Sequence, residues 1–203
     1  MKKLTLPILS ALALGLASSS VFAVDGQITI NGVVTDETCT LTGDGPGASG
    51  SKNLILTLDT VPKSTFTAPN AVAAKKSFSL QLKNAAGTGG CGAATNKALK
   101  GLYLKTAAPA DDLDTTNKTL LVNKAVDPAT VTNPAFVQIL TDTDVAVDLA
   151  AAWGTQAKSA VTGLAADGTG IATMSYKAQY FSKTGTVDAQ NVSAVVNYTL
   201  QYN

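Results

Sequence analysis

Few side chains in this sequence could carry out catalysis. The 203 residues include no histidine, which excludes the Ser–His and Cys–His systems that activate a nucleophile. A pair of carboxylates could still act as the acid and base of a glycosidase, but no acidic residue lies in a context that would raise its pKa. We therefore expect a protein that is not an enzyme and that needs no cofactor.

Two clusters of aspartates have the ligand type that calcium prefers. Their members are Asp111, Asp112 and Asp114, and Asp142, Asp144 and Asp148. Neither cluster has the loop spacing and the closing glutamate of a calcium-binding EF-hand. We interpret both clusters as solvated turns and expect no metal site.

Two further motifs are better explained by structure than by ligand binding. The glycine-rich segment 45–52 (GPGASGSK) has the composition of a phosphate-binding loop, but its lysine does not directly follow the second glycine, as that motif requires. Trp153, in the segment AAAWGT, is interpreted as a packed aromatic side chain in a loop, with sugar stacking as the alternative.

The first 23 residues have the three parts of a secretory signal peptide. A positive start at residues 1–3 precedes an apolar run at residues 4–16 and a stretch of mostly small residues at 17–23. The apolar run is shorter than a membrane-spanning helix requires, and an uncleaved anchor is the alternative. We expect export, with a mature chain that begins at Val24.

The two cysteines, Cys39 and Cys91, can form one intramolecular bridge. Export into an oxidising compartment favours this bridge over two free thiols. A zinc site would need further sulfur or nitrogen ligands, and the chain has neither a histidine nor a second pair of cysteines. The sequence therefore predicts a disulfide between Cys39 and Cys91.

The charge of the chain argues against nucleic acid as a partner. Arginine is absent, and without Lys2 and Lys3 the 15 basic residues fall to 13 against 14 acidic residues, a net charge of −1. A surface that binds nucleic acid needs a basic footprint, which this composition does not supply.

Apolar residues recur at every second position in short segments of the mature chain, which is long enough for one sizeable domain. This period of two is typical of strands that bury one face. The expected strands span residues 27–41, 53–61, 77–82, 99–106, 135–140, 145–149, 171–181 and 192–202. Among short stretches that look helical is 149–153. Many short strands separated by turns, with one disulfide, predict a β-sandwich.

The last expected strand keeps its alternation to the end of the sequence. The apolar residues that share one parity are Ala194, Val196, Tyr198, Leu200 and Tyr202. Because chain ends usually fray, a buried face that reaches the second-to-last residue indicates packing against another element. We expect no later segment to cover the outer edge of this strand, and an uncovered apolar edge invites pairing with another chain.

Several segments carry a resemblance to a known protein family. They are ITINGVVTDETC after the expected signal peptide, SFSLQLKN before Cys91, AFVQIL followed by VAVDL, GTGIATMSYKAQYF, and the terminal AVVNYTLQYN. In this order they resemble structural pilins of the chaperone–usher fimbrial family, in particular type 1 fimbrial major subunits, over essentially the whole chain. Two features depart from the family pattern. An extra AAGTGG precedes Cys91, and Gln190 stands where such pilins often carry a glycine, with Gly185 nearby.

The resemblance implies an all-β fold, an incomplete immunoglobulin-like β-sandwich that is completed by a donor strand from a neighbouring subunit. In such pilins the C-terminal strand borders an open apolar groove. A periplasmic chaperone lends a strand to this groove first, and the N-terminal extension of the next subunit later replaces it, which is β-strand addition between chains. The resemblance also implies that basic residues of the chaperone anchor the carboxylate of Asn203.

By the same resemblance, the donor strand lies at the mature N-terminus. Ile28, Ile30, Gly32 and Val34 share one parity there. In matching pilins a glycine at this point lets the donor backbone pass close over a shallow part of the groove, and close approach is a usual reason for glycine in a strand. The alternative from the pattern alone is an ordinary first strand with a bulge at Gly32.

The function implied by the resemblance is that of a fimbrial shaft subunit, which polymerises by donor-strand exchange into surface fibres that mediate adhesion. The alternative is a minor adaptor or an adhesive subunit that binds a host-surface receptor. The expected partners are copies of the chain or related pilins, a periplasmic chaperone and an outer-membrane usher. The expected location is extracellular, in a fimbrium reached through the periplasm. The expected parts of the chain are a signal peptide (1–23), a donor-strand extension (24–35) and a pilin domain (36–203).

Overall fold

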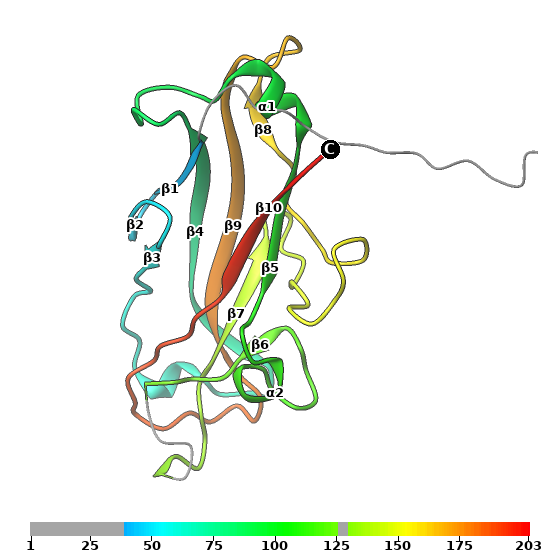
Figure 1. Ribbon diagram of the computed structural model, residues 1–203. Coiled ribbons are helices and arrows are strands. Elements are labelled where there is room, and N and C mark those ends of the chain that lie inside the picture. Colours follow the sequence, from blue (N-terminus) through cyan, green and yellow to red (C-terminus); the bar gives the residue numbers. More distant parts are fainter. Residues whose placement is uncertain (1–38, 126–129) are drawn as a thin grey trace, which may run out of the picture. The chain divides into compact units, whose positions relative to one another are not determined.

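Antiparallel strands are the main regular elements of the structure (Figure 1). The computed structural model describes residues 39–125 and 130–203. The larger sheet has the strand order β1-β4-β9-β7-β6, and β8 also pairs with β9. Its strands are β1 (Thr40–Asp44), β4 (Ala71–Lys83), β6 (Leu120–Leu121), β7 (Phe136–Thr141), β8 (Thr162–Leu164) and β9 (Gly170–Ser182).

A second sheet consists of β5 and β10, which pair antiparallel. The remaining strands, β2 and β3, form a small two-stranded unit of their own. The bounds of these elements and of the short helices are β5 (Leu99–Lys105), β10 (Asn197–Tyr202), β2 (Ala48–Ser49), β3 (Ile55–Leu56), η1 (Lys63–Thr65), α1 (Ala93–Ala98) and α2 (Pro109–Asp112).

Alternation of apolar and polar residues explains the long strands. On β9, Met174 and Tyr176 are fully buried, and they lie on one face because successive side chains of a strand point to opposite sides. On β4, Leu80 lies opposite Met174 and Phe78 lies opposite Tyr176. Cross-strand apolar pairs of this kind set the register of the sheet.

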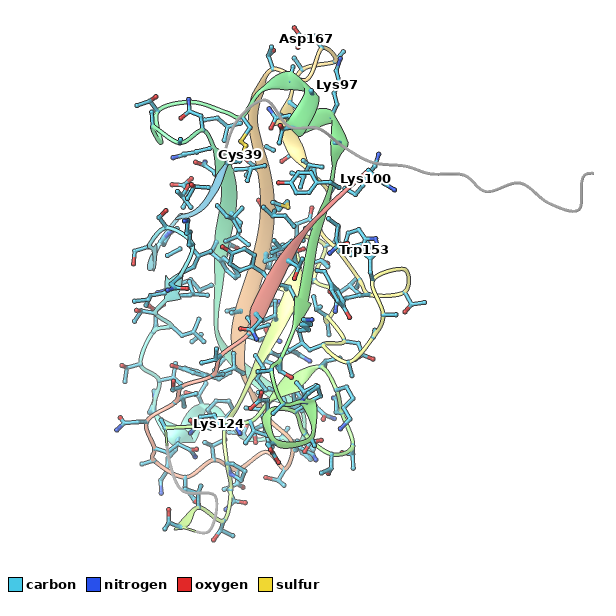
Figure 2. All side chains as sticks on the ribbon, in the orientation of Figure 1. Cys39, Lys97, Lys100, Lys124, Trp153 and Asp167 are labelled. Atoms are coloured by element: carbon cyan, nitrogen blue, oxygen red, sulfur yellow. A yellow bond between two sulfur atoms is a disulfide. The ribbon has the colours of Figure 1, made fainter. Side chains whose placement is uncertain are left out.

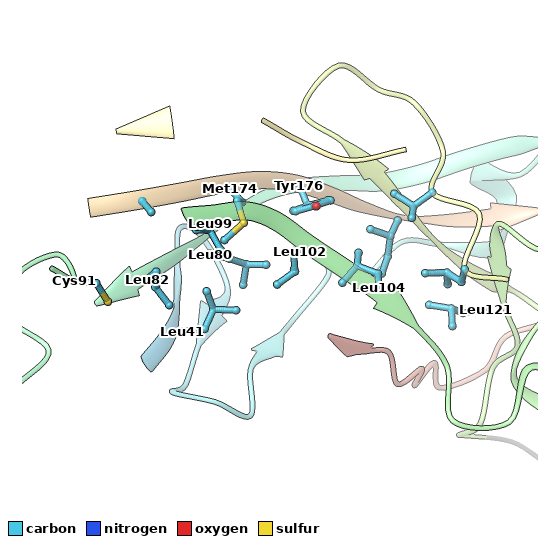
Figure 3. Close-up of a cluster of buried hydrophobic side chains, with 14 of the residues drawn as sticks. Leu41, Leu80, Leu82, Cys91, Leu99, Leu102, Leu104, Leu121, Met174 and Tyr176 are labelled. Carbon is cyan, nitrogen blue, oxygen red and sulfur yellow. The ribbon is translucent and has the colours of Figure 1, made fainter. Parts of the chain in front are cut away.

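The two sheets pack face to face around one apolar cluster (Figure 3). Leu102 and Leu104 of β5 belong to this cluster together with Leu80 of β4 and Tyr176 of β9. Burying a leucine of this kind contributes about 1.5–3 kcal/mol. The structure is therefore a β-sandwich, and the predicted all-β fold class is confirmed.

The strand order identifies the type of sandwich and shows which strand is missing. An immunoglobulin constant-type domain has seven strands, in the sheets A-B-E-D and C-F-G. The sheet order β1-β4-β9-β7 matches A-B-E-D, and the pair β5 and β10 matches C and F. These six strands also follow one another along the chain in the order A to F. The place of G is the outer edge of β10, where the described residues provide no strand.

Two expected strands are shorter than the sequence pattern predicted. Of residues 53–61 only Ile55–Leu56 forms a strand, and residues 192–196 precede the first residue of β10. Both segments border the outer edge of β10 described below, where no described strand supplies the ladder of hydrogen bonds that defines a β-strand.

The predictions for residues 145–149 and 149–153 were wrong. Val147 and Leu149 are buried as expected, but residues 145–149 form no continuous strand. One isolated bridge joins Ala146 to Leu140, and a turn begins at Leu149. The Asp148 carboxylate accepts hydrogen bonds from the backbone N–H groups of Ala150 and Ala151, which stabilise the turn there.

Helix α1 was not predicted from the sequence. Its Asn96 is buried, and the side-chain amide donates hydrogen bonds to the carbonyls of Cys91 (3.0 Å) and Gly168 (2.9 Å). These contacts connect the helix to distant parts of the chain. Because they are tertiary, no local pattern indicates them.

Cys39 and Cys91 form a disulfide, the pairing that the sequence predicts. It joins the residue before β1 to the loop between β4 and α1. The two cysteines are 52 residues apart in sequence, and closing a loop of this length removes much conformational freedom from the unfolded chain.

We predict that the double substitution Cys39→Ser, Cys91→Ser lowers the free energy of unfolding by up to about 4 kcal/mol, the chain-entropy value for such a loop. Urea unfolding of the mature protein measures the change. Reduction of the unsubstituted protein should give a similar loss, and equal stability of the oxidised and reduced proteins would contradict the prediction.

A second stabilising contact is the ion pair between Asp114 and Lys183, at 2.8 Å. Burial of Asp114 by itself raises the pKa of its carboxyl group. Hydrogen bonds from Lys183, Thr116 and Asn117 outweigh this effect, and the pKa is lowered from its ordinary value. The ionised carboxylate is therefore the form that stabilises the fold.

We predict that Asp114→Asn destabilises the protein by about 1–2 kcal/mol at pH 7. Because the folded-state pKa lies below the unfolded one, the stabilisation is complete above about pH 4 and is lost as the pH falls through the folded-state pKa. Urea unfolding at pH 7 and near pH 3 tests this sign. A difference between the two proteins that stays constant with pH would contradict the role of the charge.

Candidate functional site

An apolar groove of about 1100 Å³ lies beside the first residues of β10 and the segment that precedes them. One wall is formed by residues 192–198 and the other by residues 52–58. Its floor includes side chains of the sandwich core, among them Leu80, Leu102 and Tyr176, three of the residues labelled in Figure 3. The groove thus opens onto the interface between the two sheets.

The two walls carry the most exposed large apolar side chains of the described residues. Ile55 is 66% exposed and Val195 is 69% exposed, and both line the groove. Exposed apolar side chains that gather beside an apolar depression mark a surface that another molecule covers.

The backbone of β10 also faces the groove. Tyr198 lies opposite Leu104 of β5 in the ladder, yet the N–H and C=O of Leu104 bond to the side chain of Gln156 on the other side of β5. In an antiparallel ladder two opposed residues direct their polar groups either toward each other or away from each other. The N–H and C=O of Tyr198 therefore point into the groove, where an added strand can pair with them.

A hydrogen bond joins the two walls of the groove. The hydroxyl of Tyr198 donates to the carbonyl of Lys52 at 2.8 Å. Burial raises the pKa of the Tyr198 hydroxyl, which keeps the proton in place for this bond. The contact connects β10 to the segment that carries the opposite wall.

The structure divides the residues predicted for the groove strand into two sets. Ala194, Val196 and Tyr198 line the groove. Leu200 and Tyr202 lie farther along β10, where they are half-buried and pack against the main core cluster instead. All five predicted residues thus contact the core, but only the first three border the opening.

The other predicted site residues have different positions. Asn203 is exposed, and its backbone N–H donates to the carbonyl of Ala98 at 3.0 Å. The expected donor residues Ile28, Ile30, Gly32 and Val34 lie outside the described residues. The sequence analysis did not predict that residues 52–58 form the opposite wall of the groove. The alternation of Leu54, Leu56 and Leu58 was the pattern that could have indicated it.

The chain is similar in sequence to known fimbrial proteins. It is 32% identical over 189 residues to the F17 fimbrial protein of Escherichia coli, and the match covers 92% of each chain. The chain belongs to the fimbrial protein family. The present chain is also 28% identical over 181 residues to the major fimbrial subunit SMF-1 of Stenotrophomonas maltophilia (strain K279a). This match covers 89% of the present chain and 94% of SMF-1. The resemblance to chaperone–usher pilins is confirmed, and the protein is a fimbrial structural subunit.

No protein-family model matches the chain. Among solved structures, a Burkholderia pseudomallei antigen and type I fimbria protein superposes with a TM-score of 0.48 at 18% identity, covering 83% of this chain and 99% of the other.

Gln190 stands where related pilins often carry a glycine, and its side chain makes several hydrogen bonds in the structure. Its side-chain N–H donates to the carbonyl of Asn133 at 3.1 Å, and its side-chain oxygen accepts from Asn123 at 2.9 Å and from the N–H of Ala135 at 3.2 Å. These bonds fix the segment that leads into the groove wall. Gly185 has φ +84°, and a Cβ there would lie 2.4 Å from the backbone of Ala68, so this position requires glycine.

Most aspartates of the two clusters are engaged in ion pairs or turns. Asp144 pairs with Lys75 and Lys177, and Asp112 pairs with Lys124. Within the described residues, no group of three or more side chains is arranged to hold a metal ion. No helix in that same part of the fimbrial protein is long and apolar enough to span a membrane.

We predict that Tyr198→Phe, which removes the hydrogen bond across the groove and keeps the ring, lowers the free energy of unfolding by about 1 kcal/mol. Urea unfolding measures it. Tyr202→Phe is the matched control, because the Tyr202 hydroxyl makes no hydrogen bond within residues 39–125 and 130–203. Equal losses in the two variants would show that the bond to Lys52 contributes nothing.

Proposed function

We propose that this fimbrial protein is a shaft subunit that polymerises by donor-strand exchange into surface fibres that mediate adhesion. The observation that carries the proposal is the apolar groove beside the start of β10, at the edge where an immunoglobulin-like sandwich has its seventh strand. A strand supplied by another chain would cover the core and pair with the backbone of Tyr198.

Residues 24–35 of a neighbouring subunit are the proposed donor. Ile28, Ile30 and Val34 would enter the groove on one face of the strand, and Gly32 would pass over a shallow part of it. Each buried isoleucine would contribute about 1.5–3 kcal/mol. The backbone ladder with β10 would fix the register.

A donor segment and a groove that lie near opposite ends of the sequence would make a heterologous contact between subunits. Such a contact does not close on itself, and it therefore continues into a fibre. The name of the relative SMF-1, a major fimbrial subunit, supports the shaft role over the role of a minor adaptor.

Assembly partners follow from the same reasoning. Residues 1–23 would direct export into the periplasm and be removed, and residues 36–203 would form the pilin domain. A periplasmic chaperone would occupy the groove until the donor arrives, with its basic residues on the carboxylate of Asn203, which is exposed. An outer-membrane usher would then deliver the subunit to the growing fibre.

Moving the donor segment tests the proposal. We predict that a chain without residues 24–35 at its front, and with DGQITINGVVT joined after Asn203 by a short flexible linker, is a monomer that needs no chaperone. The linker holds the donor near its own groove at roughly millimolar effective concentration. Its midpoint of thermal unfolding should exceed that of the donor-free chain by on the order of 15 °C, from the apolar surface buried.

Two substitutions in the appended copy give a matched pair. Gly32→Leu should lower the midpoint, because its side chain would overpack a shallow part of the groove. Thr29→Leu, on the opposite face of the strand, should leave it unchanged. If the rearranged chain aggregates while the unmodified mature chain is a stable monomer alone, the sandwich is already complete and the proposal is wrong.

A further inference from the structure

The sheet formed by β5 and β10 has a second edge, on the far side of β5, and one side chain occupies it. Gln156 donates from Nε2 to the carbonyl of Leu104 at 2.7 Å and accepts from the Leu104 N–H at 3.0 Å through Oε1. These are the two bonds that a residue of a neighbouring antiparallel strand would exchange with Leu104. Gln156 thus takes the place of one residue of a partner strand.

Gln156 is held firmly in this position. It is only 3% exposed, its Nε2 also donates to the carbonyl of Asp148 at 2.8 Å, and its backbone N–H donates to the carbonyl of Ala152 at 2.9 Å. These bonds order the turn that carries the side chain.

The loop around Gln156 covers β5 as well. The Tyr103 hydroxyl donates to the carbonyl of Ala151 at 3.0 Å. Trp153 packs edge-on against the Tyr103 ring and lies next to Gly101 (Figure 2). An incoming strand would have to displace this loop to reach β5.

A side-chain amide suits this role. A strand edge offers an N–H and a C=O together, and glutamine carries both a donor and an acceptor, whereas an ionised glutamate cannot donate and a lysine cannot accept. Asparagine and glutamine carry the donor and the acceptor on two separate atoms of one amide group, and glutamine has the longer reach.

We infer that Gln156 determines which edge of the sheet accepts a strand. By closing the β5 edge at Leu104, it restricts strand addition by a second copy of this chain to the open edge of β10. This inference rests on the proposed function. Without the cap, β5 edges of two subunits could pair with each other, since an uncovered strand edge is a template for another chain.

The test uses the full mature chain bound to its assembly chaperone, which fills the β10 groove and leaves β5 as the edge under study. The complex of the unsubstituted chain should contain one copy of this chain and one copy of the chaperone at every concentration. Gln156→Met keeps an unbranched side chain but neither hydrogen bond, and its complex should double in mass as concentration rises. Light scattering after size-exclusion chromatography measures the mass.

Amide hydrogen exchange separates the inference from a loss of stability. In the doubled Gln156→Met complex, the β5 amides should become more protected with rising concentration, because they pair with the other copy. A complex that keeps its mass at every concentration and only exchanges faster at β5 would overturn the inference, since the role of Gln156 would then be structural.

Gln138→Met is the matched control. Gln138 is 7% exposed and bonds to the side chains of Gln179 (2.8 Å) and Thr119 (2.9 Å), so the variant also loses buried hydrogen bonds. Its strand β7 is paired with β6 and β9, and the loss opens no edge there. This complex should keep its mass, and doubling here too would overturn the inference.

The unsubstituted chain provides a test that does not depend on the folding of a variant. The Leu104 amide should exchange as slowly, within tenfold, as the β5 amides that pair with β10. Fast exchange at Leu104 would mean that the cap is not formed, and the inference would be wrong. Failure of the unsubstituted chain to bind a chaperone would instead contradict the proposed function.

Discussion

A sandwich sheet of two strands leaves the backbone N–H and C=O groups of its two outer edges without a strand partner. The rest of the structure depends on what covers or pairs with each edge. β5 and β10 satisfy one another along their shared ladder. Their outer edges must be capped, covered or paired with another chain, because an open edge over an apolar core is a template for association. The core beneath this small sheet is continuous with the core beneath the larger one.

The two edges are treated in opposite ways. At β5 the amide of Gln156 takes the bonds of Leu104, and the surrounding loop covers the strand. At β10 an apolar groove remains, bordered by Ile55 and Val195. Leu104 and Tyr198, which lie opposite each other in the ladder, show this difference. The backbone of Leu104 bonds to Gln156, and the backbone of Tyr198 faces the groove. The open edge of this sheet is therefore the edge of β10.

The sequence predicted the parts of the fold whose partners lie within the chain. Alternation located β4, β7 and β9, because each is paired on both sides by other strands of the chain. The same alternation at residues 53–61 was a poorer guide, because most of this segment borders the groove and has no ladder on that side. Residues 145–149 alternate in burial although they form only one isolated bridge, and a period of two cannot distinguish such a segment from a strand.

The site was predictable in part for the same reason. The last strand carried its own pattern, and Val196 and Tyr198 line the groove. Gln156 carried no signal, and Gln190 stood out only as a departure from the family's glycine, because a polar residue in a polar loop shows its role only when the tertiary contacts are known.

Electron cryomicroscopy of fibres assembled from this chain tests the central claim most directly. The account predicts a continuous extended segment beside β10 in each subunit, with the side chains of Ile28 and Ile30 in the groove and its backbone continuous with a neighbouring subunit. A groove filled by residues of the same subunit, or a segment paired to β5 instead of β10, would contradict it.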